Sequence, residues 1–114
     1  MYDSLLTELR FRIGEQYELN EFNLKSIEST FINGIEYENY EYIKDDFKTL
    51  FGVELLSNIT LQYNADILSR VIYEFDIKHY NYLKDKIRKH TCYDITLEAV
   101  IKDKSSFKLL IKKM

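Results

Sequence analysis

The chain has no proline, no tryptophan, three glycines and one cysteine among its 114 residues. The absence of proline favours regular elements joined by tight turns over extended linkers. Because Cys92 has no second cysteine to pair with, no intramolecular disulfide marks an oxidising compartment. No stretch approaches the ~18 uninterrupted apolar residues of a membrane span, and residues 1–14 lack the basic segment and long apolar run of a signal peptide. We therefore expect a soluble cytoplasmic protein with no membrane partner.

The sequence also has few residues that could hold a metal or a cofactor. His79 and His90 are eleven positions apart on one expected helix, so about 16 Å separates them along its axis. Cys92 lies close to His90, but no further cysteine or histidine completes a zinc set. The three glycines are isolated, so no glycine-rich loop is available to cradle a phosphate. We expect neither a metal nor a cofactor.

What the chain does have is a large apolar fraction. Hydrophobic residues make up 46% of it, including ten tyrosines and seven phenylalanines, whereas disordered chains combine low hydrophobicity with high net charge. A chain of this length buries roughly two thirds of its unfolded surface. The sequence therefore predicts a single domain, residues 1–114, with one core. An AT-rich genome would also encode many tyrosines without any selection for binding.

Charge is divided unevenly along the chain. Residues 1–66 carry thirteen acidic and five basic side chains, a net charge of −8. Residues 67–114 carry six acidic and eleven basic side chains, a net charge of +5, so the whole chain has a net charge of −3. Such asymmetry creates local fields that favour oppositely charged partners.

Alternating apolar runs predict three β-hairpins. Asn33-Gly34 separates residues 26–32 from residues 35–43, and this dipeptide favours the positive φ angles of a type I′ turn. The alternation in the second run slips once between Tyr37 and Tyr40, which indicates a bulge. The first hairpin would pair Ile32 with Ile35 and Thr30 with Tyr37. The other two hairpins are expected from strands 59–63 and 71–77 around a turn at 64–66, and from strands 93–101 and 107–111 around residues 102–106.

Apolar residues at helical spacing predict three helices. The first covers residues 3–12 with Asp3 as its N-cap, although residues 9–13 also alternate as a strand would. The second covers residues 43–51 and ends at Gly52, and the third covers residues 79–90. The predicted fold class is α+β, an antiparallel sheet built from about three β-hairpins with two or three helices packed on one face.

The run of residues 36–42, in which glutamates alternate with tyrosines, is the strongest candidate for a binding surface. Tyrosine supplies a large contact area at a modest entropy cost, and carboxylates attract and orient a basic partner. The alternative interpretation is an ordinary two-faced strand with its charges outside and its aromatic rings inside. The expected partner-binding residues are Glu36, Tyr37, Glu38, Tyr40, Glu41, Tyr42, Asp45 and Asp46.

This surface predicts a non-catalytic, inhibitor-type protein-binding module. Its partner would be a basic protein, a toxin or a nucleic-acid enzyme, with a surface such as a nuclease cleft. Bacterial immunity proteins and phage proteins that block host or defence enzymes are examples of such modules. The hypothesis rests on charge and size, and no family signature in the sequence supports it.

A second hypothesis is a nuclease that depends on Mg²⁺. Glu74, Asp76 and Lys78 share one face of a predicted strand, and paired carboxylates can hold Mg²⁺ while a lysine stabilises developing charge. With Asp66, this segment superficially resembles the acid-x-Lys half of the PD-(D/E)xK nuclease signature. The resemblance covers residues 66–78 only, and no proline precedes Asp66. The alternative interpretation is a solvated strand face.

The basic C-terminal half could also bind nucleic acid without cleaving it. The alternative is a solvated face, or one that neutralises the acidic half of the chain. Exposed hairpin edges could pair across a two-fold axis, so a homodimer is a further expectation. The basic residues concerned are Lys84, Lys86, Arg88, Lys89, Lys102, Lys104, Lys108, Lys112 and Lys113.

Overall fold

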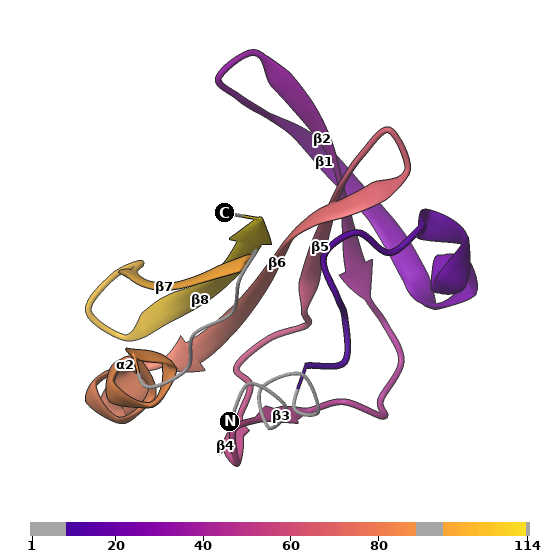
Figure 1. Cartoon of the computed structure of the whole chain (residues 1–114). Coiled ribbons are helices and arrows are strands. Elements are labelled where there is room, and N and C mark those ends of the chain that lie inside the picture. Colours follow the sequence, from indigo (N-terminus) through magenta and orange to yellow (C-terminus); the bar gives the residue numbers. More distant parts are fainter. Residues whose placement is uncertain (1–8, 89–94, 114) are drawn as a thin grey trace.

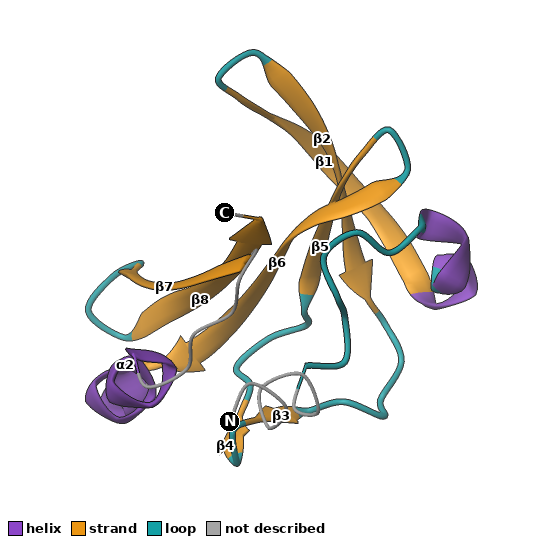
Figure 2. Ribbon diagram, in the orientation of Figure 1, coloured by secondary structure: helices purple, strands orange, loops and turns teal. Residues whose placement is uncertain are grey.

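A computed structural model describes residues 9–88 and 95–113 of the chain. The largest unit of this part is a six-stranded antiparallel sheet with the strand order β1-β2-β5-β6-β8-β7 (Figures 1 and 2). Two further strands, β3 (Thr49–Leu50) and β4 (Val53–Glu54), pair only with each other. The strands of the large sheet are β1 (Leu24–Ile32), β2 (Ile35–Tyr42), β5 (Thr60–Asn64), β6 (Ile67–Asp76), β7 (Ile95–Ile101) and β8 (Ser106–Lys113).

Helices contribute much less than the sequence predicts. In the described part of the chain the α-helix is α2 (Tyr80–Arg88), and the other helical segments are the short 3₁₀ turns η1 (Tyr17–Leu19), η2 (Glu21–Asn23) and η3 (Ile77–His79). The predicted α+β class, with two or three helices packed on one face, is therefore wrong. The fold is mainly antiparallel β, and none of its described helices is long and apolar enough to traverse a lipid bilayer.

The first predicted hairpin is confirmed. Asn33 and Gly34 adopt φ angles of 52° and 82°, and this turn pairs Ile32 with Ile35 and Thr30 with Tyr37 as expected. The expected slip within β2 is wrong, because the register shift lies in β1, between Ile27 and Thr30. Strand β2 therefore alternates without interruption, which decides where its glutamates and tyrosines point.

The other two hairpins and the third helix are also confirmed within the described residues. Ala65 and Asp66 form the β5–β6 turn with φ angles of 50° and 65°, and β7 pairs with β8. Helix α2 buries Leu83 and Ile87, as its spacing predicts. Strand β8 lies between β6 and β7. Of the expected third helix and third hairpin, residues 89–94 lie outside the described part.

The described end of the first expected helix and the whole of the second are not helical. Residues 9–12 are not helical, and Leu9 and Phe11 alternate as buried residues; the rest of that expected helix, residues 3–8, lies outside the described part. Residues 43–48 form a loop, and β3 and β4 then turn at Phe51-Gly52, where φ is 53° and 77°. Two consecutive positive φ angles make a tight turn and are incompatible with a right-handed helix.

The core lies on one face of the large sheet. The N-terminal segment, the β3–β4 ladder and α2 contribute Phe11, Leu50 and Leu83 to it, and these side chains are fully buried. The ring of Phe11 meets that of Tyr42 edge to face at a centroid distance of 4.8 Å. Figure 1 shows the β1–β2 hairpin reaching beyond these covering segments, so the outer part of the sheet keeps exposed side chains.

Candidate functional site

Alternation along β2 sends the expected binding residues to opposite faces of the sheet. Asn39 lies opposite Gln62 and Glu41 lies opposite Thr60, whereas Glu38 lies opposite the core residue Tyr63. Because neighbouring side chains of a strand point to opposite faces, one face carries Glu36, Glu38, Tyr40 and Tyr42. The face with Tyr37, Asn39 and Glu41 is named the open face, because it is the face opposite the core.

Tyr42 is a core residue. It is 2% exposed, and its hydroxyl donates to Asp46 Oδ1 at 2.6 Å. This hydrogen bond, with Lys44 nearby, lowers the pKa of Asp46, while burial raises the pKa of Tyr42. Asp45 forms an exposed ion pair with Lys48 at 3.1 Å. The structure therefore buries Tyr42 in the core and pairs Asp45 and Asp46 with lysines of the same loop.

Four carboxylates and two tyrosine rings lie on or beside the face that β2 shares with the core. We call Glu15, Glu36, Glu38, Asp66, Tyr17 and Tyr40 the acidic patch. The N–H of Tyr17 donates to the Asp66 carbonyl at 2.8 Å, and the ring centroids of Tyr17 and Tyr40 are 5.1 Å apart. Asn64 Nδ2 donates to the Glu36 carbonyl at 3.1 Å and links the β5–β6 turn to β2.

The electrostatics of the buried rings reflect the surrounding carboxylates. Burial raises the pKa of Tyr40, and the negative charges of Glu38 and Asp66 raise it further. Burial, with a contribution from Glu15, raises the pKa of Tyr63 to about 12. Within residues 9–88 and 95–113, Glu36, Glu38 and Asp66 form no ion pair. The chain does not neutralise this patch with its own described lysines and arginines.

An exposed aromatic residue extends the patch toward the tip of the first hairpin. Phe31 lies directly opposite Glu36 on the same face and is 70% exposed. It belongs to β1, which is the edge strand of the sheet, so no further strand of the described chain covers it on that side. Exposed aromatic rings are enriched at protein interfaces, so Phe31 adds contact area to the patch.

The residues of the nuclease hypothesis do not come together. Glu74 and Asp76 share the open face, opposite Lys108 and Ser106, but Asp66 precedes β6 and Asp76 ends it. A ten-residue strand separates them by about 30 Å. Asp76 instead accepts a hydrogen bond from the backbone N–H of Lys78 and caps η3. Asp66 therefore cannot share a metal ion with Glu74 or Asp76.

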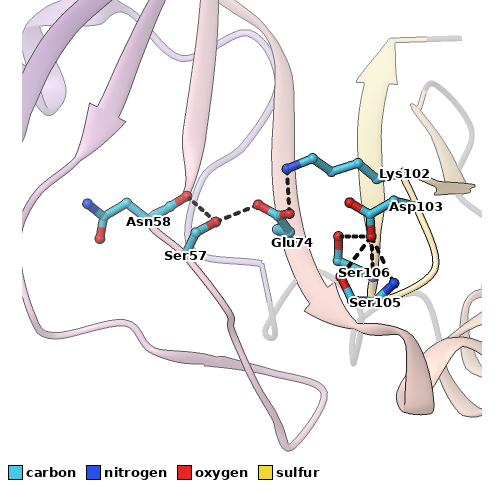
Figure 3. A network of polar contacts seen from close by, with 7 residues as sticks. All are labelled: Ser57, Asn58, Glu74, Lys102, Asp103, Ser105 and Ser106. Atoms are coloured by element: carbon cyan, nitrogen blue, oxygen red, sulfur yellow. Dashed lines mark hydrogen bonds and ion pairs between the residues drawn. The ribbon is translucent and has the colours of Figure 1, made fainter.

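The Glu74 carboxylate is engaged by the protein itself (Figure 3). Lys102 Nζ donates to Glu74 Oε2 at 2.9 Å, and Ser57 Oγ donates to Oε1 at 2.9 Å. Burial opposes ionisation of Glu74, but these donors outweigh it, so its pKa is lowered. Asp103 accepts from the N–H groups of Ser105 and Ser106 at 2.8 and 3.0 Å and fixes the loop that carries Lys102. Glu74 and Lys102 therefore form an ion pair within the protein.

The basic residues of the C-terminal half divide between two places. Lys108 and Lys112 lie on the open face, opposite Glu74 and Arg70, whereas Lys84, Lys86 and Arg88 lie on α2. Lys89, His90 and Cys92 lie outside the described part. Among the described residues, no three His, Cys, Asp or Glu side chains approach closely enough to hold a metal ion.

No protein-family model, curated protein or solved structure matches this chain.

Proposed function

We propose that the chain is a non-catalytic, inhibitor-type protein-binding module of the cytoplasm that presents the acidic patch to a basic surface of a partner protein. The observation that supports this proposal is the position of Glu36, Glu38 and Asp66. These carboxylates are exposed and have no ion-pair partner within the described residues. Glu38 and Asp66 lie near enough to Tyr40, which contacts Tyr17, for their charges to raise its pKa.

The patch contains carboxylates, which attract a basic partner, and aromatic rings, which supply contact area. Unscreened carboxylates of one sign accelerate encounter with a basic surface and fix its orientation. Partly buried tyrosines and an exposed phenylalanine supply apolar contact area that costs little side-chain entropy to order. Phe31 and Tyr40 are therefore the expected anchors, and Glu36 and Glu38 the expected steering charges.

The partner chemistry follows from the regular spacing of the charges. Glu36 and Glu38 project from one face of a single strand at a separation of roughly 7 Å. A row of anions on a rigid element fits a cleft lined with lysine and arginine, such as the phosphate-binding cleft of a nuclease or another nucleic-acid enzyme. A toxin or enzyme of this kind is the proposed partner, and blocking of its cleft is the proposed action.

The strict alternation of β2 provides a matched test. The tagged chain captures its partner from the cells that express it, and the double variant Glu36→Lys/Glu38→Lys is expected to lose at least 90% of that capture. The control is Glu41→Lys, which makes the same kind of change on the same strand but on the open face, and it is expected to retain capture. Equal capture by wild type and the double variant, with unchanged unfolding midpoints, would reject the proposal.

A further inference from the structure

A groove on the open face is lined by basic side chains. It has a volume of about 340 Å³ and lies between the tip of the β1–β2 hairpin and the adjoining ends of β6 and β8. We call Ile35, Tyr37, Ser69, Arg70, Lys112 and Lys113 the basic groove. All of its charged lining residues are cations, although the chain as a whole has a net charge of −3.

The cations of the groove are held close together without a counterion from the chain. Arg70 and Lys112 are direct cross-strand partners on β6 and β8, and like charges in that position are destabilising. Within the described residues, neither Arg70, Lys112 nor Lys113 forms an ion pair. An anionic ligand would relieve this repulsion, so the groove is electrostatically suited to bind one.

An aromatic ring lies beside the cations. The guanidinium of Arg70 lies over the Tyr37 ring, with Cζ 5.7 Å from the ring centroid, and Ile35 lines the same groove. An arginine beside a tyrosine ring, with an apolar side chain next to them, offers a surface on which an unpaired nucleic-acid base can stack. Free phosphate or an acidic peptide would use the cations but not this surface.

The row of residues across the sheet at Arg70 contains polar atoms that the protein does not satisfy. Gln62, Arg70, Lys112 and Thr96 lie side by side on β5, β6, β8 and β7. Gln62 Oε1, Arg70 Nε and Thr96 Oγ1 are buried and have no hydrogen-bond partner in the protein. Unsatisfied buried polar atoms are uncommon in native proteins and call for an explanation. These three atoms place a strip of buried polar groups beneath the open face at the level of the basic groove.

A further lysine lies on the same face beyond the groove. Lys108 projects from the same face of β8 as Lys112, about 13 Å away along the strand, and lines a second pocket of about 270 Å³ with Lys102. The carboxylate in that pocket, Glu74, is already paired with Lys102 at 2.9 Å. The exposed Glu98 lies between the two lysines on the neighbouring strand β7, opposite Leu110, so the basic groove itself, and not the length of β8, is the proposed site.

From these observations we propose that the basic groove binds a single-stranded nucleic acid, with phosphates at Arg70, Lys112 and Lys113 and one base against Tyr37. This site lies on the opposite face from Glu36 and Glu38 and is independent of the acidic patch. The two halves of the charge asymmetry then have separate roles. The acidic patch binds protein, and the basic groove binds nucleic acid.

The test is fluorescence anisotropy of a labelled ten-nucleotide oligo-dT, titrated with the full chain at several salt concentrations. Arg70→Gln and Lys112→Gln are each expected to weaken binding and to reduce the slope of log K against log salt by about 0.7, the value for one lost phosphate contact to a single strand. Tyr37→Leu is expected to weaken binding about tenfold through lost stacking. Lys78→Gln removes an exposed lysine from η3, outside the groove, and is the matched control, expected to leave binding unchanged.

The proposal would be overturned by no binding of oligo-dT at 50 mM salt, or by equal binding by wild type and the folded Arg70→Gln and Lys112→Gln variants. Tighter binding of a ten-base-pair duplex than of the single strand would likewise overturn it. Equal affinity for thymidine monophosphate and the ten-mer would also overturn it, because the ligand would then be a free nucleotide. The Glu36→Lys/Glu38→Lys variant is expected to keep oligo-dT binding, so failure of this proposal is distinguishable from failure of the acidic-patch proposal.

Discussion

Gln62 Nε2 donates to Asn39 Oδ1 at 3.0 Å across the β5–β2 pair, and both residues are buried although they lie on the open face. Asn39 Nδ2 in turn donates to the Glu28 carbonyl at 2.8 Å and to Thr30 Oγ1 at 2.6 Å. The Glu28 carbonyl only accepts hydrogen bonds, so the Asn39 atom that faces it must be the nitrogen. The oxygen of Asn39 therefore faces Gln62, and the Gln62 atom that faces it must also be the nitrogen. These bonds join β1, β2 and β5 beneath the open face.

The amide pair predicts a coupled loss of stability. Asn39→Ala removes these bonds and leaves buried polar groups unpaired, so the free energy of unfolding is expected to fall by about 2 kcal/mol. Replacing both partners with Asn39→Ala/Gln62→Leu should cost less than the sum of the two single changes. Urea denaturation of the wild type, Asn39→Ala, Gln62→Leu and the double variant measures these losses of stability. Strictly additive losses would show that the two amides act independently.

The Phe51-Gly52 turn predicts the direction in which Gly52→Ala changes the free energy of unfolding. With Gly52 at a φ of 77° and open space around it, Gly52→Ala is expected to lower the free energy of unfolding by about 1 kcal/mol through backbone strain alone. Urea denaturation measures the shift, and an unchanged or raised midpoint would contradict the positive φ of this position.

Alkaline pH is expected to destabilise the fold through its buried tyrosines. The pKa of Tyr63 is raised by burial to about 12 in the folded state, above the ordinary value near 10. The unfolded chain therefore loses this proton first, and the stabilisation present below pH 10 is lost as the pH rises toward 12. One such group reduces the free energy of unfolding by at most about 1.4 kcal/mol per pH unit. Tyr63→Phe should give a shallower decline between pH 9 and 11, and an identical decline would contradict this assignment.

Acid pH is expected to weaken the Glu74–Lys102 ion pair. Burial opposes ionisation of Glu74, but the hydrogen bonds from Lys102 and Ser57 lower its pKa below the usual 4.5. Its contribution to stability is therefore complete above about pH 4.5 and disappears as the pH falls through the folded-state pKa. Glu74→Gln should lower the thermal midpoint at pH 7 and have little effect at pH 2.5. Lys104→Met, an exposed change in the same loop, is the control that should leave both midpoints unchanged.

Local turn chemistry was predictable from the sequence, whereas long-range packing was not. Asn33-Gly34 determines the first hairpin because the positive φ angles of its turn depend on those two residues. The spacing of Phe47, Leu50 and Phe51 fits an amphipathic helix. In the structure, Leu50 and Val53 are instead buried cross-strand partners in the β3–β4 ladder. Burial against the sheet overrides helix propensity there. Strand order is likewise set by packing between distant segments.

The candidate site was predictable only in part, for the same reason. Glu36, Glu38 and Tyr40 were recognisable from their alternation on one strand, but the misplaced bulge mixed them with Tyr37 and Glu41 from the other face. Glu15, Tyr17 and Asp66 join the patch because Gln16 bridges to Ile67 and the N–H of Tyr17 donates to the Asp66 carbonyl. No sequence signal links these segments, which lie about fifty residues apart in the chain.

The proposed function requires that the acidic patch be open to a cationic partner on one face of the sheet only. NMR titration of ¹³C-labelled chain with an oligolysine peptide tests this through the side-chain carboxylate resonances. Glu36, Glu38 and Asp66 are expected to shift together and saturate at one peptide concentration, while Glu41 and Glu74 on the open face keep their shifts. Equal perturbation of Glu41 and Glu38, or no perturbation of Glu36 and Glu38, would contradict the account.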